Sequence, residues 1–184
     1  MTVCGRPGPP RVTWLREEFE QLALELRDRS REVFERDGCH IPISFLFATR
    51  HPESGRPHAH VMPILSDWDS DEEKDLFVHA LGLVAHRLQA VGLVSIMEMW
   101  SSFVDIEGLS DEEALERVRQ APRPHDAPDR REALFVMVEH SRFGCRAYQA
   151  EILRDSRGKP SLAPWQEPSG KLGGRFMRIL PEVS

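Results

Sequence analysis

The chain contains 184 residues, of which 40% are hydrophobic and 29% are charged. This composition is typical of a globular protein and excludes an intrinsically disordered one. The length fits one domain with one hydrophobic core. We therefore expect a flexible, Pro/Gly-rich leader over residues 1–12 and a single domain over residues 13–184.

The net charge and the hydropathy pattern argue against nucleic-acid and membrane partners. The formal net charge is -6, whereas proteins that bind nucleic acid through its phosphates carry an excess of Lys and Arg. No apolar run approaches the roughly 20 residues needed to cross a bilayer, and residues 1–10 lack the apolar stretch of a secretory signal. We expect a cytoplasmic protein with no nucleic-acid partner and no membrane partner.

Basic side chains are concentrated between residues 141 and 178. They fit either a solvated face or a surface for an acidic partner, and we favour the solvated face. The three cysteines, Cys4, Cys39 and Cys145, have no C-x-x-C spacing, so neither a disulfide framework nor a cysteine zinc site is indicated. We expect Cys39 and Cys145 to be buried as small apolar residues.

The first element is an amphipathic helix. Apolar residues recur at three- and four-residue steps from Trp14 to Phe34, with charged residues between them. Thr13 is the expected N-cap, and the helix should run to Asp37. Gly38 then supplies the left-handed residue that commonly ends a helix.

A hairpin and a second helix follow. Residues 41–48 and 58–65 are rich in β-forming side chains and are separated by a Pro/Gly-containing loop, which predicts two paired strands. Ser70 and Glu73 form a capping box ahead of a broad apolar stripe that ends before Gly92.

The second half begins with residues 93–100, a mostly apolar segment that we predict to be a central strand. Residues 101–131, called the excursion below, combine a capped helical segment over residues 110–120 with the proline-rich sequence APRPHDAP. An irregular connection of this length is more often functional or mobile than a simple link.

The remaining segments predict a meander of antiparallel strands, because turn-forming residues separate them. These strands cover residues 133–139, 145–154 and 162–166, and an edge strand over 175–180 is possible before Pro181. The expected fold is α+β, with a single antiparallel sheet of about five to six strands, two helices on one face and the order αββαβββ(β).

Two histidines raise the question of a metal site. His58 and His60 are separated by one residue in a predicted strand, so their imidazoles point to the same face. With Glu98 as the base they would form a small metal-dependent hydrolase. The H-x-H pattern is similar to that of JAB-type metalloproteases, but the expected S-x-x-D is displaced, since Ser66 and Asp69 come two residues too early. We favour two histidines on an edge strand and expect no metal and no cofactor.

Glu98 is the most informative single residue, because a carboxylate at the end of an apolar strand is costly to bury unpaired. Cationic partners are available in Arg123, Arg130 and Arg131. One interpretation is a salt bridge that fastens the excursion to the sheet, and this is the one we favour. The other is a ligand site in which an arginine binds an acid and Glu98 acts as a base. The candidate binding residues are Glu98, Trp100, Arg130, Arg131 and Glu132.

The same residues carry a family resemblance. The segments EMW (98–100) and PDRRE (128–132) resemble those of uncharacterised bacterial and phage-encoded small proteins that have an E-A-W strand end and an H-P-D-R-x-E segment. The likeness covers about residues 15–160 and departs from the pattern at Met99 and at residues 125–127. It implies no known activity, only that the strand end and the Arg-Arg-Glu segment belong together.

The sequence contains no phosphate-binding glycine loop, nucleophile elbow or readable catalytic triad. The hypothesis that we favour is a non-catalytic interaction or regulatory module whose excursion binds a protein partner. The alternative is the metal-dependent hydrolase that uses His58, His60 and Glu98. The oligomeric state is open at this point.

Overall fold

The computed structural model describes residues 14–66, 68, 70–102, 104–168, 176 and 178–180. This part of the chain folds as an α+β protein with three α-helices and six strands in the order αββαβαβββ. The elements are α1 Arg16–Asp37, β1 Ile43–Arg50, β2 Pro57–Leu65, α2 Asp71–Arg87, β3 Gly92–Ser101, α3 Asp111–Gln120, the 3-10 helix η1 Pro124–Asp126, β4 Arg131–His140, β5 Gly144–Arg154 and β6 Pro160–Leu162.

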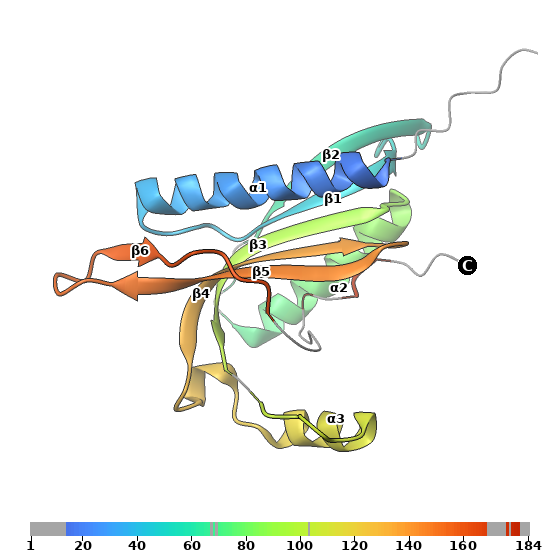
Figure 1. Cartoon of the computed structure of the whole chain (residues 1–184). Helices are drawn as coiled ribbons and strands as arrows, with labels where there is room; N and C mark the ends of the chain where they lie inside the picture. The colour runs from blue at the N-terminus through green and yellow to red at the C-terminus, as the bar shows by residue number, and fades with distance from the viewer. Residues whose placement is uncertain are drawn as a thin grey trace, which may run out of the picture.

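All six strands form one antiparallel sheet in the order β2-β1-β3-β4-β5-β6, and the sheet is curled (Figure 1). This pairing confirms the predicted β1–β2 hairpin and the β4–β5–β6 meander. The last strand of the meander lies earlier than predicted, since β6 ends at Leu162, where the predicted strand over 162–166 begins. It also confirms that β3 is internal, between β1 and β4. Of the predicted edge strand over 175–180, residues 176 and 178–180 are described and are not in a strand, and the other two lie outside the described residues.

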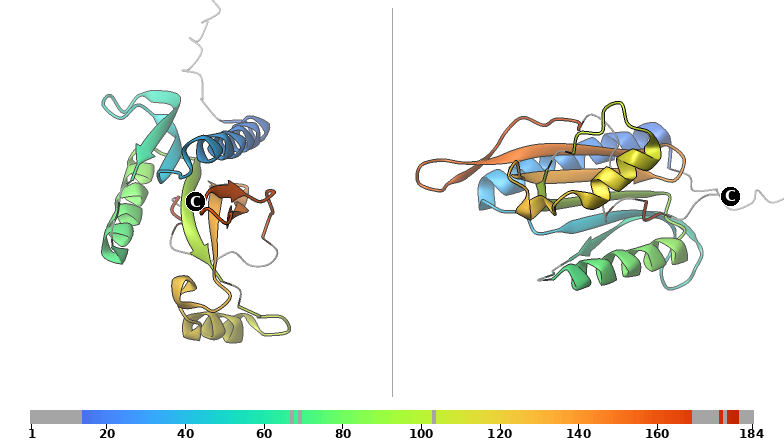
Figure 2. Two further views of the ribbon diagram at one scale, coloured as in Figure 1. Left: turned by 90° about the vertical axis from the view of Figure 1, so that its left-hand side faces the viewer. Right: turned by 90° about the horizontal axis from the view of Figure 1, so that it is seen from below.

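The two long helices lie on opposite faces of the sheet (Figure 2), so the prediction that both pack on one face is wrong. Phe19 of α1 is in one core cluster with Phe47, whereas Leu81 of α2 is in another with Leu46. Successive residues of a strand point to opposite faces, so these two β1 side chains reach different layers. The physical reason is clearest in β3, where residues 92–97 are all buried and therefore need cover on both sides.

α1 ends where the sequence predicts. Gly38 has a φ of 76°, in the left-handed region, and its N–H donates to the carbonyl oxygen of Phe34 at 2.7 Å. The expected N-cap, Thr13, lies outside the described residues. The described helix begins at Arg16, with Leu15 in the N-cap position.

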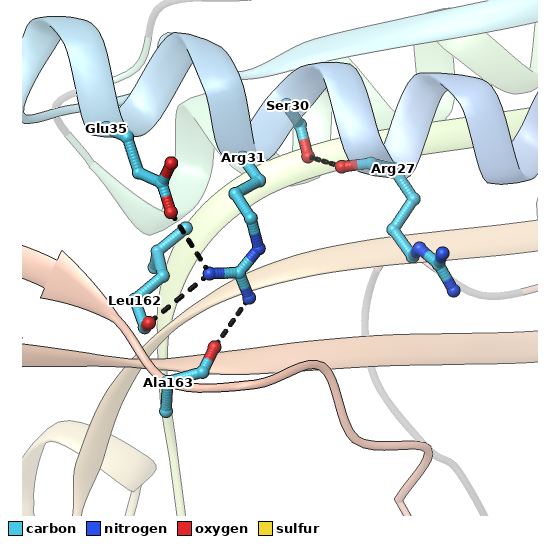
Figure 3. A network of polar contacts seen from close by, with 6 residues as sticks. All are labelled: Arg27, Ser30, Arg31, Glu35, Leu162 and Ala163. Carbon is cyan, nitrogen blue, oxygen red and sulfur yellow. Dashed lines mark hydrogen bonds and ion pairs between the residues drawn. The ribbon is translucent and has the colours of Figure 1, made fainter.

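A polar network ties α1 to the far end of the chain (Figure 3). The Arg31 guanidinium donates to the carbonyl oxygens of Leu162 at 3.2 Å and Ala163 at 2.5 Å, and it pairs with Glu35 at 3.3 Å. The same guanidinium lies over the Trp165 ring, 5.2 Å from its centroid. One side chain therefore satisfies two carbonyl oxygens at the end of the short edge strand β6.

α2 begins with the predicted capping box. The backbone N–H of Ser70 donates to the Glu73 carboxylate at 3.1 Å, and the Glu73 N–H donates to the Ser70 hydroxyl at 3.2 Å. Next to α2, Phe176 and Leu180 from the C-terminal segment are buried in the clusters on that face. The buried Glu139 carboxylate accepts the backbone N–H groups of Ile179 and Leu180, at 3.0 and 2.9 Å, and so holds this segment in place.

The excursion leaves the sheet between β3 and β4 and carries α3 away from it (Figure 1). The predicted helical segment is confirmed, with a capping box in which the Ser110 N–H donates to the Glu113 carboxylate at 2.9 Å. Within the described residues, α3 makes at most marginal contact with the other helices and strands. The excursion is therefore attached to the sheet mainly through its two ends.

Two smaller predictions have different outcomes. Cys39 and Cys145 are exposed, so their predicted burial is wrong. Cys39 follows Gly38, the C-cap of α1, and Cys145 is the second residue of β5, so both lie at the end of an element. Cys4 lies outside the described residues. As the hydropathy pattern predicts, no helix in the described part of the chain is long and apolar enough to span a bilayer.

Candidate functional site

The β3–β4 register brings several of the predicted residues together where the excursion joins the sheet. Glu98 pairs with Leu134, and Trp100 pairs with Glu132. Because alternate residues share a face, Glu98, Trp100 and Glu132 all lie on the face covered by α1. The Arg130 guanidinium lies over the Trp100 ring, 5.4 Å from its centroid, a distance typical of a cation–π contact.

Arg131 does not join this group. It pairs with Ser101 in the ladder, and its guanidinium lies 3.5 Å from the carboxylate of Glu151. Arg131 is next to Glu132 in β4, so its side chain faces the other side of the sheet. Glu151 pairs with Ala133, which shares that other side with Arg131. The five predicted binding residues are thus divided between two faces.

Glu98 is only partly buried, and its hydrogen-bond partner is a backbone group. Its carboxylate accepts the backbone N–H of His40, in the loop after α1. Burial raises the pKa of the Glu98 carboxyl above its ordinary value. The His40 hydrogen bond and the nearby Arg154 lower this pKa, and the Glu132 carboxylate raises it.

The arginine that enters this site was not among the candidates. Arg154, the last residue of β5, donates to both carboxylate oxygens of Glu132, at 2.8 and 3.0 Å. Glu132 in turn raises the pKa of the Arg154 guanidinium, chiefly through this hydrogen bond. We name Glu98, Trp100, Arg130, Glu132 and Arg154 the root cluster.

The predicted ion pair between Glu98 and an arginine of the excursion is not formed. Arg123 pairs with Asp71 of α2 at 3.0 Å, and Arg130 lies over an aromatic ring. Among the described residues, no ion pair joins Glu98 to either of these arginines or to Arg131. The prediction was wrong because the β4–β5 register, which no local pattern reveals, decides which guanidinium reaches this face.

A shallow depression of about 440 Å³ lies beside the root cluster, open to solvent. His40 connects the two, since its backbone N–H binds Glu98 while the residue also lines the depression. Burial lowers the pKa of the His40 imidazole. The other lining residues are mostly apolar or small: Cys39, Ile41, Pro42, Leu65 and Ser66.

The histidines lie at the opposite end of the sheet. His60 pairs with Ala48 of β1, whereas Glu98 lies beyond the pair formed by Ile43 and Ile96. Five residues of strand separate these two levels, so the carboxylate is more than about 15 Å from the histidines along the sheet. His58, His60 and Glu98 therefore do not form a single site.

The histidines themselves form a small ring cluster with His51. The centroids of His58 and His60 are 5.3 Å apart, and these rings are stacked at an angle of 28°. No group of three or more His, Cys, Asp or Glu side chains in the described part of the chain could hold a metal ion.

The root cluster is organised to hold structure together. The Glu132 carboxylate is satisfied by Arg154, and the Glu98 carboxylate accepts a backbone N–H. Trp100 and Arg130 cover each other at the surface. The Glu132–Arg154 pair connects β4 to β5, and the Arg130–Trp100 contact connects the segment before β4 to β3, so these contacts lie at both strands from which the excursion emerges.

Comparison with known proteins places the chain in a family. No curated protein and no solved structure is significantly similar to it. A family model described as bacteriophage lambda protein ea47 matches residues 12–170. This match spans most of the chain and agrees with the expected relation to phage-encoded proteins without an assigned activity. The chain therefore belongs to the phage lambda protein ea47 family, whose function is unknown.

Proposed function

We propose that the protein is a non-catalytic interaction module that binds a protein partner through the excursion. The observation that carries this proposal is the exposed apolar face of α3. Leu115 and Val118 are 52% and 50% exposed on a helix that stands away from the sheet (Figure 1).

Leu115 and Val118 are three residues apart, so they are neighbours on one face of the helix. Ala114, four residues before Val118, is buried, so the exposed pair lies beside the buried side of the helix. Charged residues border it, among them Glu116 and Arg119, which are paired with each other at 3.9 Å. An amphipathic helix of this kind fits a partner with an apolar groove.

The attachments of the excursion favour binding with little loss of entropy. The ion pair of Arg123 with Asp71 connects the end of the excursion to the start of α2. The β3–β4 pairing and the contact of Arg130 with Trp100 join the two strands from which the excursion emerges. A surface that is already ordered loses less conformational freedom when a partner binds.

The proposal is tested with a double variant, Leu115→Asp with Val118→Asp, and with Leu153→Asp as the control. Leu153 is a similarly exposed leucine on β5, outside the excursion. Each full-length protein is used for affinity capture from a bacterial lysate with quantitative mass spectrometry. The captured protein is then purified, and its affinity for each variant is measured by calorimetry.

We expect a protein that binds wild type and the control equally but binds the double variant at least about tenfold more weakly, since two exposed apolar anchors are replaced by charges. Circular dichroism should show that all three proteins are folded. If every captured protein binds the double variant as well as wild type, or if none is captured, the proposal is wrong.

A further inference from the structure

A second unpartnered surface lies on the outer side of α2. This helix buries Leu81 and Ala85 against the sheet, while Leu76 and Leu83 on the other side are 68% and 61% exposed. Figure 2 shows α2 as the outermost layer on its face of the sheet. Ala80, between them, is also exposed.

The exposed residues follow a symmetric pattern along the helix. At 3.6 residues per turn, Glu72, Leu76, Leu83 and Arg87 lie within about 40° of one line along the helix surface. The order along this line is acid, leucine, leucine, base, with spacings of four, seven and four residues. Read from the opposite end, the pattern has the same spacings and the same two leucines, with the base in the place of the acid and the acid in the place of the base.

The charges at the two ends of α2 are opposite. The first turn carries Asp71, Glu72 and Glu73, and the last turn carries His86 and Arg87. If two copies of α2 pack in antiparallel orientation, the acidic end of each helix lies beside the basic end of the other. Leu76 then meets Leu83 of the second copy, and Glu72 meets Arg87 of the second copy.

We propose that the outer face of α2 binds a second copy of this chain, forming a two-fold symmetric dimer through antiparallel α2 helices. The two-fold axis passes between residues 79 and 80, so the exposed side chains of His79 and Ala80 lie nearest to it. A two-fold interface requires a self-complementary surface, and the acid-leucine-leucine-base order provides one. Because the interface is a single pair of helices, it is small and the dimer is weak.

This dimer uses a surface different from the apolar face of α3. The inference therefore does not rest on the proposed function of the excursion, and either one can fail without the other.

The first experiment measures self-association of the full chain by sedimentation equilibrium from about 10 µM to about 1 mM, the range in which a small interface is detected. Wild type should form dimers. Leu83→Asp should be a monomer throughout, whereas Leu115→Asp, on α3, should associate as wild type does.

The charge pattern gives a sharper test. Glu72→Arg and Arg87→Glu should each weaken the dimer about fivefold at low salt, since each places like charges opposite one another twice. The double variant that combines them restores opposite charges across the interface and should recover wild-type affinity. Each substitution also has an unfavourable interaction with the helix dipole. The double variant contains both unfavourable interactions, so a recovery of affinity must come from the contacts between the two copies.

A third experiment locates the axis. Ala80→Cys is made in a background with Cys4→Ser, Cys39→Ser and Cys145→Ser, and Glu112→Cys on α3 is the control. Mild oxidation should crosslink the Ala80→Cys protein into covalent dimers and leave the control monomeric. A wild-type chain that is monomeric at about 1 mM, or a dimer that shows neither charge-swap recovery nor crosslinking at position 80, would overturn the proposal.

Discussion

The sheet body and the excursion differ in where their apolar side chains point. In the body, Leu81 of α2 and Phe47 of β1 are fully or almost fully buried. In the excursion, Leu115 and Val118 are about half exposed on a helix of similar capping chemistry. Because burial of apolar side chains is the main stabilising contribution to a fold, we expect the body to provide most of the free energy of unfolding and the excursion to provide exposed surface.

The strongest test of this comparison makes the same substitution in both regions. Leu81→Ala should lower the free energy of unfolding by about 2 to 5 kcal/mol, because it leaves a cavity between α2 and the sheet. Leu115→Ala should lower it by less than about 0.5 kcal/mol. Urea denaturation of both variants measures the two values. If Leu81→Ala lowers the free energy of unfolding by less than about 1 kcal/mol, the packing of α2 on the sheet does not stabilise the fold as we expect.

The second test concerns local stability. Trypsin should cut the folded protein first within residues 101–131, where Arg117 and Arg119 are exposed. Ser110→Ala removes the N-cap of α3, which typically costs about 1 kcal/mol, so cleavage at these arginines should become about fivefold faster. The urea midpoint should stay unchanged, because α3 opens without the body.

The matched control for this test is Ser70→Ala, which removes the equivalent cap of α2. Because α2 is packed on the sheet, this variant should lower the free energy of global unfolding by about 1 kcal/mol and leave the first cleavage site unchanged. First cleavage within residues 70–92 in the wild-type protein would contradict the division into body and excursion.

The smallest effect is expected at the junction of the two regions. Glu98→Gln keeps an oxygen that can accept the His40 N–H, so the free energy of unfolding at pH 7 should fall by no more than about 1 kcal/mol. A loss of about 3 to 5 kcal/mol, as when a buried ion pair is broken, would restore the salt-bridge interpretation.

The same variant tests the raised pKa of Glu98. A carboxyl whose pKa is higher in the folded state binds its proton more tightly there, so it adds stability at low pH and loses it as the pH rises through the folded pKa. The stability of wild type relative to Glu98→Gln should therefore decrease as the pH rises from about 4, the ordinary pKa of a glutamate, through the higher pKa of the folded state. A difference that is constant with pH would show that folding does not change this pKa.

Local patterns predicted the elements of the fold well. Gly38, Ser70 and Ser110 each mark a helix end that the structure confirms, because caps depend on a few consecutive residues. The side of the sheet on which each helix packs was predicted wrongly. An amphipathic stripe shows that a helix has a buried face, but not which layer it covers, although the continuous burial of residues 92–97 indicates cover on both sides.

The candidate site was predicted in part for a related reason. Glu98, Trp100 and Glu132 come together because the ends of β3 and β4 are joined by the excursion. The separation of Arg131 from them follows from strand alternation and was available in the sequence. Arg154 contacts Glu132 because of the register between β4 and β5. This register is a property of the folded sheet and cannot be derived from a local pattern.

The hydrogen bonds from Arg31 to the carbonyl oxygens of Leu162 and Ala163 affect how the chain folds during its synthesis. α1 is synthesised before β6, and its partners in these hydrogen bonds are separated from it by more than a hundred residues of sequence. The apolar side of α1 can pack earlier on β1, where Phe19 contacts Phe47, but the Arg31 hydrogen bonds can form only after residue 163 has been translated. Such late closure is typical of folds with high contact order, which fold slowly.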